Sequence, residues 1–487
     1  MKRIHIVTIF LFGLLSAQGG GNALEFDGVD DIVNCGTDTS LNIQDMLTIE
    51  VWIRSPESNS YARIVDRYDF FQHQGFNLVR YPEMNSAMLD FYSTVDTKHT
   101  YGGYTPVFDN NWHYVAATFD SINIRIYIDG RLEEHAVLPE GKRIQLCPRY
   151  LAIGNGFDGA TWFPFHGIID EVRLWNTALD SATIRDWMHK RLSPEHPRFS
   201  HLAGYWTFNE GQGSIAGDSS GFQNDGVITG MDTTSAWINS TVPLAESPVD
   251  QLLNVSAIWA SRDSASSSIL SIQDTSVTGD ACVIFAHNGE DLTWNSSDIP
   301  ENSGILNRIK RTWQVEVYDT LSATLIFDVS GLDMTDGNAL CLLIDDDGDF
   351  SNADTAHGIY NPVNNSFTIP NQNLQFGNYY TIGTEESMIS NVTQTPTAPP
   401  KRLLLSQNYP NPFNPETQFY YTLPNAASIE INLYNISGQK VKVLYNGFQS
   451  AGEHRVKIRG DDLSSGLYFY EIKTPTKIIR KKCILLR

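Results

Sequence analysis

Short segments in which apolar and polar residues alternate recur along the whole chain, and turn-forming residues separate them. In LTIEVWIRS, Ile49, Val51 and Ile53 alternate with Glu50 and Arg54, and WHYVAATFD and IRIYIDGRL show similar alternation. A period of two places successive side chains on opposite faces of a β-strand. Only residues 181–192 have the apolar spacing of a helix. The pattern therefore predicts an all-β protein made of sandwiches or barrels.

Residues 403–487 form a small unit with a distinctive beginning and end. Pro410, Pro412 and Pro415 keep the lead-in NYPNPFNP out of regular structure, because proline fixes φ and removes a backbone donor. Alternating segments such as SIEINLY follow, separated by Ser-Gly and Ala-Gly turns. We expect a self-contained β-sandwich here.

This unit resembles the C-terminal sorting domain of the type IX secretion system of Bacteroidetes-like bacteria. The resemblance rests on NYPNPFNP, LYNISGQKV, AGEHRV, SGLYFYEI and the terminal RKKCILLR. It implies an immunoglobulin-like fold that binds the type IX machinery, export across the outer membrane, and removal of the domain. The mature protein is then expected to be released or attached to the cell surface.

The other end of the chain agrees with export. Lys2 and Arg3 precede an apolar run over residues 4–15, and small residues follow at Ser16 and Ala17. This run is too short for a transmembrane helix and is typical of a secretory signal peptide, which we predict over residues 1–17. A Pro/Thr-rich linker is predicted at residues 391–402, where processing would cut.

Charge and cysteine content limit the possible partners. The 34 basic and 56 acidic residues give a net charge of −22, which disfavours nucleic acid because phosphate would be repelled. The five cysteines lack metal-ligand spacing. In an exported protein Cys35 and Cys147 could pair, as could Cys282 and Cys341, although the sequence cannot show that either pair is close.

Residues 22–243 resemble the laminin-G-like, concanavalin-A-like jelly rolls of bacterial surface proteins. The resemblance rests on ALEFDGVDDIVNCG, LTIEVWIRS, NWHYVAATFD, IYIDGRL and HGIIDEVRLWNTALDSATI. Residues 252–385 are predicted to form a second small sandwich. Through NGEDLTW, RIKRTWQVEV, LLIDDDGDFS and GNYYTIGT it resembles a domain that often lies between such a module and a sorting domain in exported proteins. With the sorting domain, we predict three β-sandwich domains in series.

The sequence offers candidate site residues only in the first domain. Resemblance to related jelly rolls suggests a calcium ion held by Asp27, Asp170 and Asp218, although these aspartates could equally cap turns. For a ligand, the candidates are the aromatic residues of two loops, which could stack on sugars or pack over the sandwich edge: Tyr101, Tyr104, Trp162 and Phe163. In the second domain, Asp345, Asp347 and Asp349 have the wrong glycine position for an EF-hand, so an acidic turn is expected.

No catalytic arrangement stands out. Glycoside hydrolysis needs two carboxyl groups on either side of one bond, and the closest stretch, residues 168–172, lacks the third carboxylate of the laminarinase-like motif. We therefore predict a non-enzymatic binding or adhesion protein that recognises a glycan or a surface protein. The alternatives are a polysaccharide-processing enzyme with an unrecognised site and a purely structural surface component.

Overall fold

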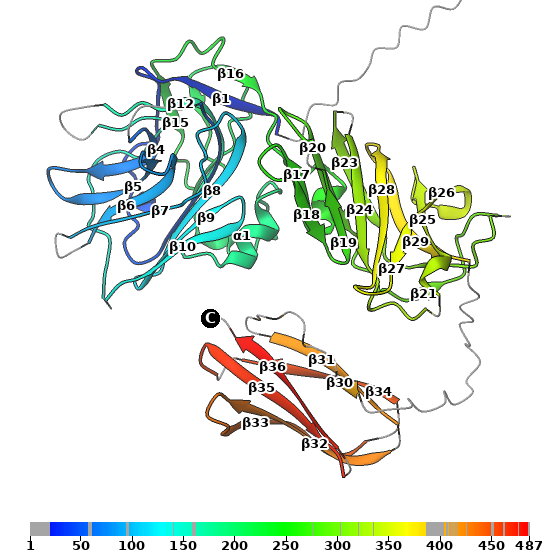
Figure 1. The fold of residues 1–487 in the computed structure, drawn as a ribbon. Coiled ribbons are helices and arrows are strands. Elements are labelled where there is room, and N and C mark those ends of the chain that lie inside the picture. The colour runs from blue at the N-terminus through cyan, green and yellow to red at the C-terminus, as the bar shows by residue number, and fades with distance from the viewer. Residues whose placement is uncertain are drawn as a thin grey trace, which may run out of the picture. The chain divides into compact units, whose positions relative to one another are not determined.

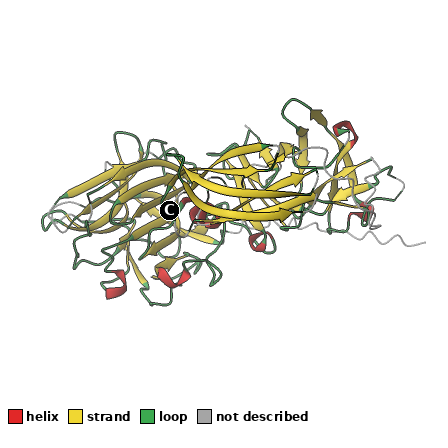
Figure 2. Ribbon diagram, turned by 90° about the horizontal axis from the view of Figure 1, so that it is seen from below, coloured by secondary structure: helices red, strands yellow, loops and turns green. Residues whose placement is uncertain are grey.

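The computed structural model describes residues 20–385 and 404–485. Within these ranges it leaves out residues 57–60, 94–96, 140, 158–161, 275, 302, 320, 335, 406–407, 409–410, 412, 414–415, 425, 450–451, 461–462 and 476. The predicted signal peptide and linker therefore lie outside the described residues. The chain divides into two compact units, Met1–Ile389 and Ser390–Arg487. Strands make up nearly all the regular structure of each unit, and the helices are short (Figures 1 and 2).

The first sandwich has two antiparallel sheets. Sheet A is eight-stranded, in the order β10-β9-β8-β3-β12-β1-β16, with β13 also paired to β12. Its strands are β1 (Asn22–Asp27), β3 (Leu47–Arg54), β8 (Trp112–Phe119), β9 (Asn123–Ile128), β10 (Arg131–Val137), β12 (His166–Trp175), β13 (Leu202–Trp206) and β16 (Trp237–Asn239).

Sheet B faces sheet A and is also eight-stranded, in the order β14-β15-β2-β11-β4-β5-β6-β7. Its strands are β2 (Ile32–Asn34), β4 (Arg63–Asp69), β5 (Gln74–Tyr81), β6 (Ser86–Tyr92), β7 (Lys98–Gly102), β11 (Ala152–Ile153), β14 (Ile215–Ala216) and β15 (Gly226–Thr229). The alternating apolar residues of both sheets, such as Ile49, Val51 and Leu78, form one buried core between them. This is the expected use of a period-two pattern.

The predicted helix is shorter than expected. The helix α1 (Ser181–Trp187) begins where Asp180 accepts a hydrogen bond from Thr183 N–H, but it ends before residue 192. The carbonyls at its end accept hydrogen bonds from side chains of sheet A: Arg173 donates to Trp187 O, and Trp52 donates to Met188 O. Helix periodicity alone could not show this competition. The remaining helical turns are η1 (Thr39–Leu41), η2 (Phe199–His201), η3 (Val249–Gln251), η4 (Gly337–Ala339) and η5 (Phe350–Asn352).

A second sandwich follows in the same unit. One sheet has the order β17-β20-β23-β29-β22-β21, with β25 paired to β29 and β26 paired to β25, and the other has the order β18-β19-β24-β28-β27. The strands are β17 (Leu253–Trp259), β18 (Ser264–Ser267), β19 (Leu270–Gln273), β20 (Cys282–His287), β21 (Trp294–Asn295), β22 (Asn307–Ile309), β23 (Trp313–Tyr318), β24 (Leu321–Asp328), β25 (Leu340–Asp345), β26 (Asp354–His357), β27 (Ile359–Asn361), β28 (Ser366–Leu374) and β29 (Tyr379–Thr384).

The C-terminal unit is a third sandwich, with sheets in the orders β30-β31-β34 and β33-β32-β35-β36. Its strands are β30 (Leu404–Leu405), β31 (Glu416–Leu423), β32 (Ala427–Asn435), β33 (Lys440–Gln449), β34 (Gly452–Arg459), β35 (Gly466–Lys473) and β36 (Ile478–Leu485). Ile429, Ile431 and Leu433 are buried in its core, as their alternation predicts. The all-β fold class with several sandwiches is confirmed.

Candidate functional site

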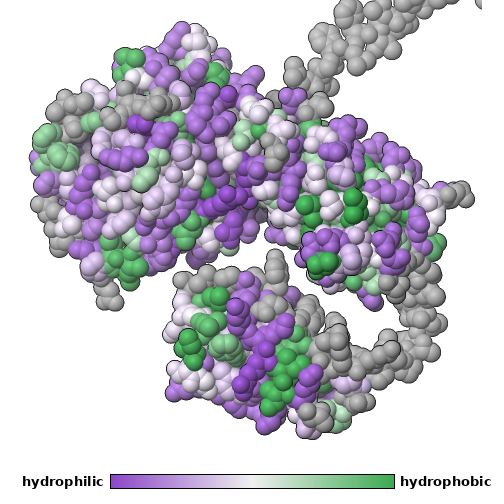
Figure 3. Space-filling model, viewed as in Figure 1, coloured by the Kyte–Doolittle hydropathy of each residue, from purple (hydrophilic) through white to green (hydrophobic). Residues whose placement is uncertain are grey.

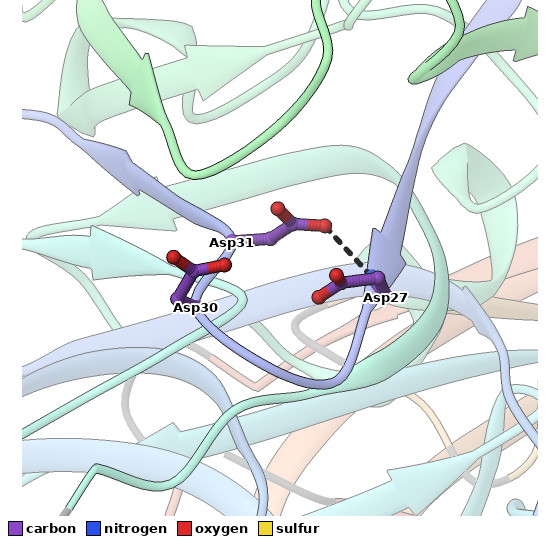
Figure 4. Close-up of side chains that lie close together, drawn as sticks. All are labelled: Asp27, Asp30 and Asp31. Carbon is purple, nitrogen blue, oxygen red and sulfur yellow. Dashed lines mark hydrogen bonds between the residues drawn. The ribbon is translucent and has the colours of Figure 1, made fainter.

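Three aspartates lie together at the turn between β1 and β2. Asp27 ends β1, and Asp30 and Asp31 precede β2; one carboxylate oxygen from each lies within 4.8 Å of the others. Two hydrogen bonds shape the turn: Asp27 N–H donates to Asp31 Oδ2 at 2.7 Å (Figure 4), and Val29 N–H donates to Asp27 Oδ1 at 2.7 Å. Gly28 has a positive φ of 79°, which suits a residue without a Cβ. The loop therefore gathers three acids at one point.

The three carboxylates of this group affect one another. Burial raises the pKa of Asp31, which is 4% exposed, and the negative charges of Asp27 and Asp30 raise it further. Asp27 and Asp30 are exposed. Hard cations such as Ca²⁺ prefer several carboxylate oxygens and would relieve the repulsion. Asp27, Asp30 and Asp31 are thus the residues of the first sandwich best placed to hold a metal ion.

An open pocket of about 430 Å³ lies beside these aspartates. Two contacts bring its walls together. The pairing of β1 with β12 sets Asp27 opposite His166, and Glu25 N–H donates to Ala236 O, in the loop after β15, at 2.9 Å. Its lining combines carboxylates with apolar side chains. The lining residues are Glu25, Phe26, Asp27, Asp31, His166, Gly230, Met231, Asp232, Ser235 and Ala236. We call this hollow the Asp27 pocket.

Asp170 lies elsewhere, inside the protein. It is fully buried on β12, where its Oδ2 accepts a hydrogen bond from Ser240 Oγ at 2.5 Å and its Oδ1 accepts one from Glu171 N–H at 2.7 Å. Burial raises its pKa well above the ordinary value, and the charge of Glu171 adds to the effect. Since His166 is the residue opposite Asp27, Asp170 lies four residues along the strand, roughly 13 Å away.

Asp218 caps a turn, the alternative use that the sequence left open. Its carboxylate accepts hydrogen bonds from Tyr205 N–H at 2.9 Å, Ser220 N–H at 2.8 Å and Asn224 N–H at 2.9 Å. The structure thus groups Asp27 with Asp30 and Asp31 and not with Asp170 and Asp218. Asp30 and Asp31 stand in the motif FDGVDD, so the adjacent acids were the signal available in the sequence.

The four aromatic candidates differ in what they present to solvent. Tyr101 is partly buried against the first core, and Tyr104 is 55% exposed but donates its hydroxyl to Glu134 at 2.5 Å. Trp162 is 48% exposed, and its ring centroid lies 4.9 Å from that of Phe157. Phe163 is half-buried, and the Arg63 guanidinium carbon lies 4.9 Å from the centroid of the Phe163 ring. Among the four, Trp162 combines an exposed ring with a second aromatic ring packed beside it.

The carboxylates nearest to a glycosidase-like pair are closed off from any polymer. Asp170 and Glu171 are both fully buried, and Glu171 accepts hydrogen bonds from Tyr205 Oη at 2.5 Å and from Arg173 at 3.0 Å. A general acid and a nucleophile must both reach the glycosidic bond. These two residues instead stabilise the region around β12.

The acidic loop after β25 forms the expected turn. Asp345 is 5% exposed and its Oδ1 accepts hydrogen bonds from Asp347 N–H at 2.9 Å and Gly348 N–H at 2.5 Å. The carboxylates of Asp345, Asp346 and Asp347 lie close to one another. Turn capping accounts for this arrangement.

The cysteine pairs that the sequence left open do not form. All five cysteines are free and buried. Cys282 lies on β20 and Cys341 on β25, with β23 and β29 between them in the sheet, so the Cα atoms are at least about 14 Å apart. Cys35 follows β2, whereas Cys147 contacts Gly75 at the start of β5, three strands away. A disulfide needs Cα atoms within about 7 Å.

Comparison with protein families identifies the parts. Residues 27–185 match the Concanavalin A-like lectin/glucanases superfamily, and residues 407–486 match the Secretion system C-terminal sorting domain. The chain is an exported protein with a concanavalin A-like domain. Its sorting domain directs it through type IX secretion to the cell surface or the medium. Residues 254–381 match a domain of unknown function. Among the described residues, no helix has the length and apolar character to cross a membrane.

Several solved structures are similar in part. A putative carbohydrate binding protein from Bacteroides ovatus is 17% identical over 46% of this chain and 61% of its own, with a TM-score of 0.34. The carbohydrate-binding module CBM40 of a Ruminococcus gnavus sialidase, bound to sialyllactose, is 16% identical over 33% of this chain and 92% of its own, with a TM-score of 0.28. Domains LG4-5 of the mouse laminin α1 chain are 11% identical over 75% of this chain and 82% of their own, with a TM-score of 0.27. The chain thus spans about three-fifths of the Bacteroides ovatus protein. No curated protein matches the sequence. TM-scores this low carry no argument about what this chain binds.

Proposed function

We propose that this exported protein binds a glycan without cleaving it, and that the Asp27 pocket is the binding site. The observation that supports the proposal is the pocket itself, an open hollow of about 430 Å³ lined by carboxylates, His166 and the apolar Met231 on a concanavalin A-like domain. Carboxylates accept hydrogen bonds from sugar hydroxyls, and an apolar wall suits the C–H face of a sugar ring.

We further propose that Ca²⁺ occupies the Asp27, Asp30 and Asp31 group at the rim of this pocket. Two of the three carboxylates are exposed, so their oxygens can face an ion and the ion can face the pocket. Burial raises the pKa of Asp31 and the charges of Asp27 and Asp30 add to the rise; a cation there would offset this repulsion. Sugar hydroxyls would then approach a positive centre as well as hydrogen-bond acceptors.

A glycan array tests both proposals. The wild-type chain and the variants Asp27→Ala and Asp232→Ala are each applied in millimolar calcium and again with a chelator. The matched control is Asp354→Ala, an exposed aspartate on β26 of the second sandwich. We expect calcium-dependent binding that both pocket variants lose and the control keeps. Binding only to a neighbouring surface protein, or to nothing, would reject the glycan proposal, and release of reducing sugar ends would show an enzyme.

A further inference from the structure

One apolar cluster crosses from the first sandwich to the second. It lies on the outer face of sheet A, the face turned away from sheet B, and includes residues of both sandwiches. From the first come Trp52, Trp112, Tyr114, Trp175, Ile184 and Met188, and from the second come Val255, Ala257, Trp259, Cys282, Ile284 and Ala286. Trp52 and Tyr114 are fully buried although they do not face the core between the sheets.

Trp259, the last residue of β17, is central to this contact. It is 3% exposed, and its ring centroid lies 5.6 Å from that of Trp52 and 5.3 Å from that of His189. Its indole N–H donates to Trp112 O at 2.9 Å. A large aromatic side chain with its one donor satisfied is the usual anchor of a stable interface.

Polar contacts surround the apolar cluster. Arg54 forms an ion pair with Asp280 at 2.5 Å, and Thr241 Oγ1 donates to the same carboxylate at 2.9 Å. Lys190 Nζ donates to Leu252 O at 2.9 Å. An apolar centre with a polar rim is the anatomy of a specific interface.

Sheet A could not leave this face open to water. Without the second sandwich, Trp52 and Trp112 would lose the cover of Trp259 and add to an aromatic surface of a kind that soluble monomers rarely expose. Glu50 and Arg173 are also buried: Glu50 accepts a hydrogen bond from Trp175 Nε1 at 2.7 Å, and Arg173 pairs with Glu171 at 3.0 Å. Buried charges need partners of this kind.

From these contacts we propose that the second sandwich, which matches a domain of unknown function, is the obligate intramolecular partner of the concanavalin A-like domain. It closes the outer face of sheet A, and the two sandwiches fold and unfold as one body. The surfaces of the first sandwich that remain open to ligands are therefore sheet B and the loops at the ends of the sandwich, including the Asp27 pocket.

Proteolytic cleavage of the segment between the two sandwiches tests whether they stay associated without a covalent link. A site-specific protease sequence is placed at Ser247 and Pro248, which are exposed between the sandwiches, in the full chain. After cleavage we expect the halves to co-elute at micromolar concentration. Trp259→Ala should raise their dissociation constant at least a hundredfold, because it removes a buried anchor and its hydrogen bond. Trp294→Ala, a half-buried tryptophan packed on the second core, is the control and should change nothing in the association.

A charge swap keeps the proposal testable if Trp259→Ala does not fold. Asp280→Arg should weaken the association of the cut halves, and adding Arg54→Asp should restore much of it, since opposite charges face each other again. Wild-type halves that separate after cleavage would overturn the proposal. So would cut halves of Trp259→Ala that associate as tightly as those of Trp294→Ala.

Discussion

The buried arginine of β12 allows a stringent prediction about stability. Arg173 is fully buried and donates to Glu171 Oε2 at 3.0 Å, Lys190 O at 2.6 Å and Trp187 O at 3.0 Å. Burial raises the pKa of Glu50, and the charge of Arg173 opposes this rise. We expect Arg173→Leu to destabilise the first unit severely.

The magnitude follows from what the substitution leaves behind. Glu171 and Glu50 are each at most 1% exposed and would lose the cation beside them. Removing one partner of a buried ion pair costs about 3–5 kcal/mol. Two carbonyl acceptors also lose their donor, at about 1 kcal/mol each where no water replaces it. The expected loss is about 5–7 kcal/mol, a large part of the total stability of most domains.

Urea unfolding at pH 7, followed by circular dichroism, measures the loss. Arg173→Leu combined with Glu171→Leu should recover part of it, because one of the two uncompensated carboxylates is then gone. The control is Arg143→Leu, which breaks an exposed ion pair with Asp45 and should cost less than about 1 kcal/mol. A loss below about 1 kcal/mol for Arg173→Leu, or a double variant no more stable than the single one, would refute the reasoning.

Three further predictions concern calcium, pH and export. Millimolar calcium should raise the melting temperature, because a hundredfold excess over Kd stabilises the folded state by about 2.7 kcal/mol. Asp27→Ala should abolish this temperature shift, whereas Asp218→Ala should lower stability but retain the shift. The reverse pattern would contradict the site. Burial lowers the pKa of His113, but the charge of Asp129 acts in the opposite direction, and the resulting pKa is about 9. Protonated His113 therefore contributes about 3 kcal/mol to the free energy of unfolding; this contribution is complete below pH 6.5 and is lost as pH rises through 9. Urea unfolding between pH 6.5 and 9.5 should show a steeper decline for wild type than for His113→Gln, and equal slopes would count against it. Deleting residues 403–487 should retain the folded remainder in the periplasm, since the sorting domain lies there; cell fractionation that finds the truncated chain outside the cell at normal yield, without lysis, would disprove this.

Much of the fold could be predicted from local pattern. The alternation of Ile429, Ile431 and Leu433 places them in the core of the third sandwich, and the motif residues of the first and third domains led to the correct families. The candidate site was predicted only in part. Asp27 was chosen for its position at a strand end, but its partners are its neighbours in the motif, Asp30 and Asp31.

The sequence by itself determined which segments are strands, because side-chain alternation is a local property of the backbone. Only the tertiary structure decided what covers each face. Glu50 and Trp52 alternate with core residues of β3 and would be expected at the surface, yet both are buried. Glu50 accepts hydrogen bonds from Tyr114 and Trp175, and Trp52 packs against Trp259 of the second sandwich. Likewise, strand register set Asp27 opposite His166 and carried Asp170 away from it. Register and packing depend on residues far apart in the chain, so no local pattern contains them.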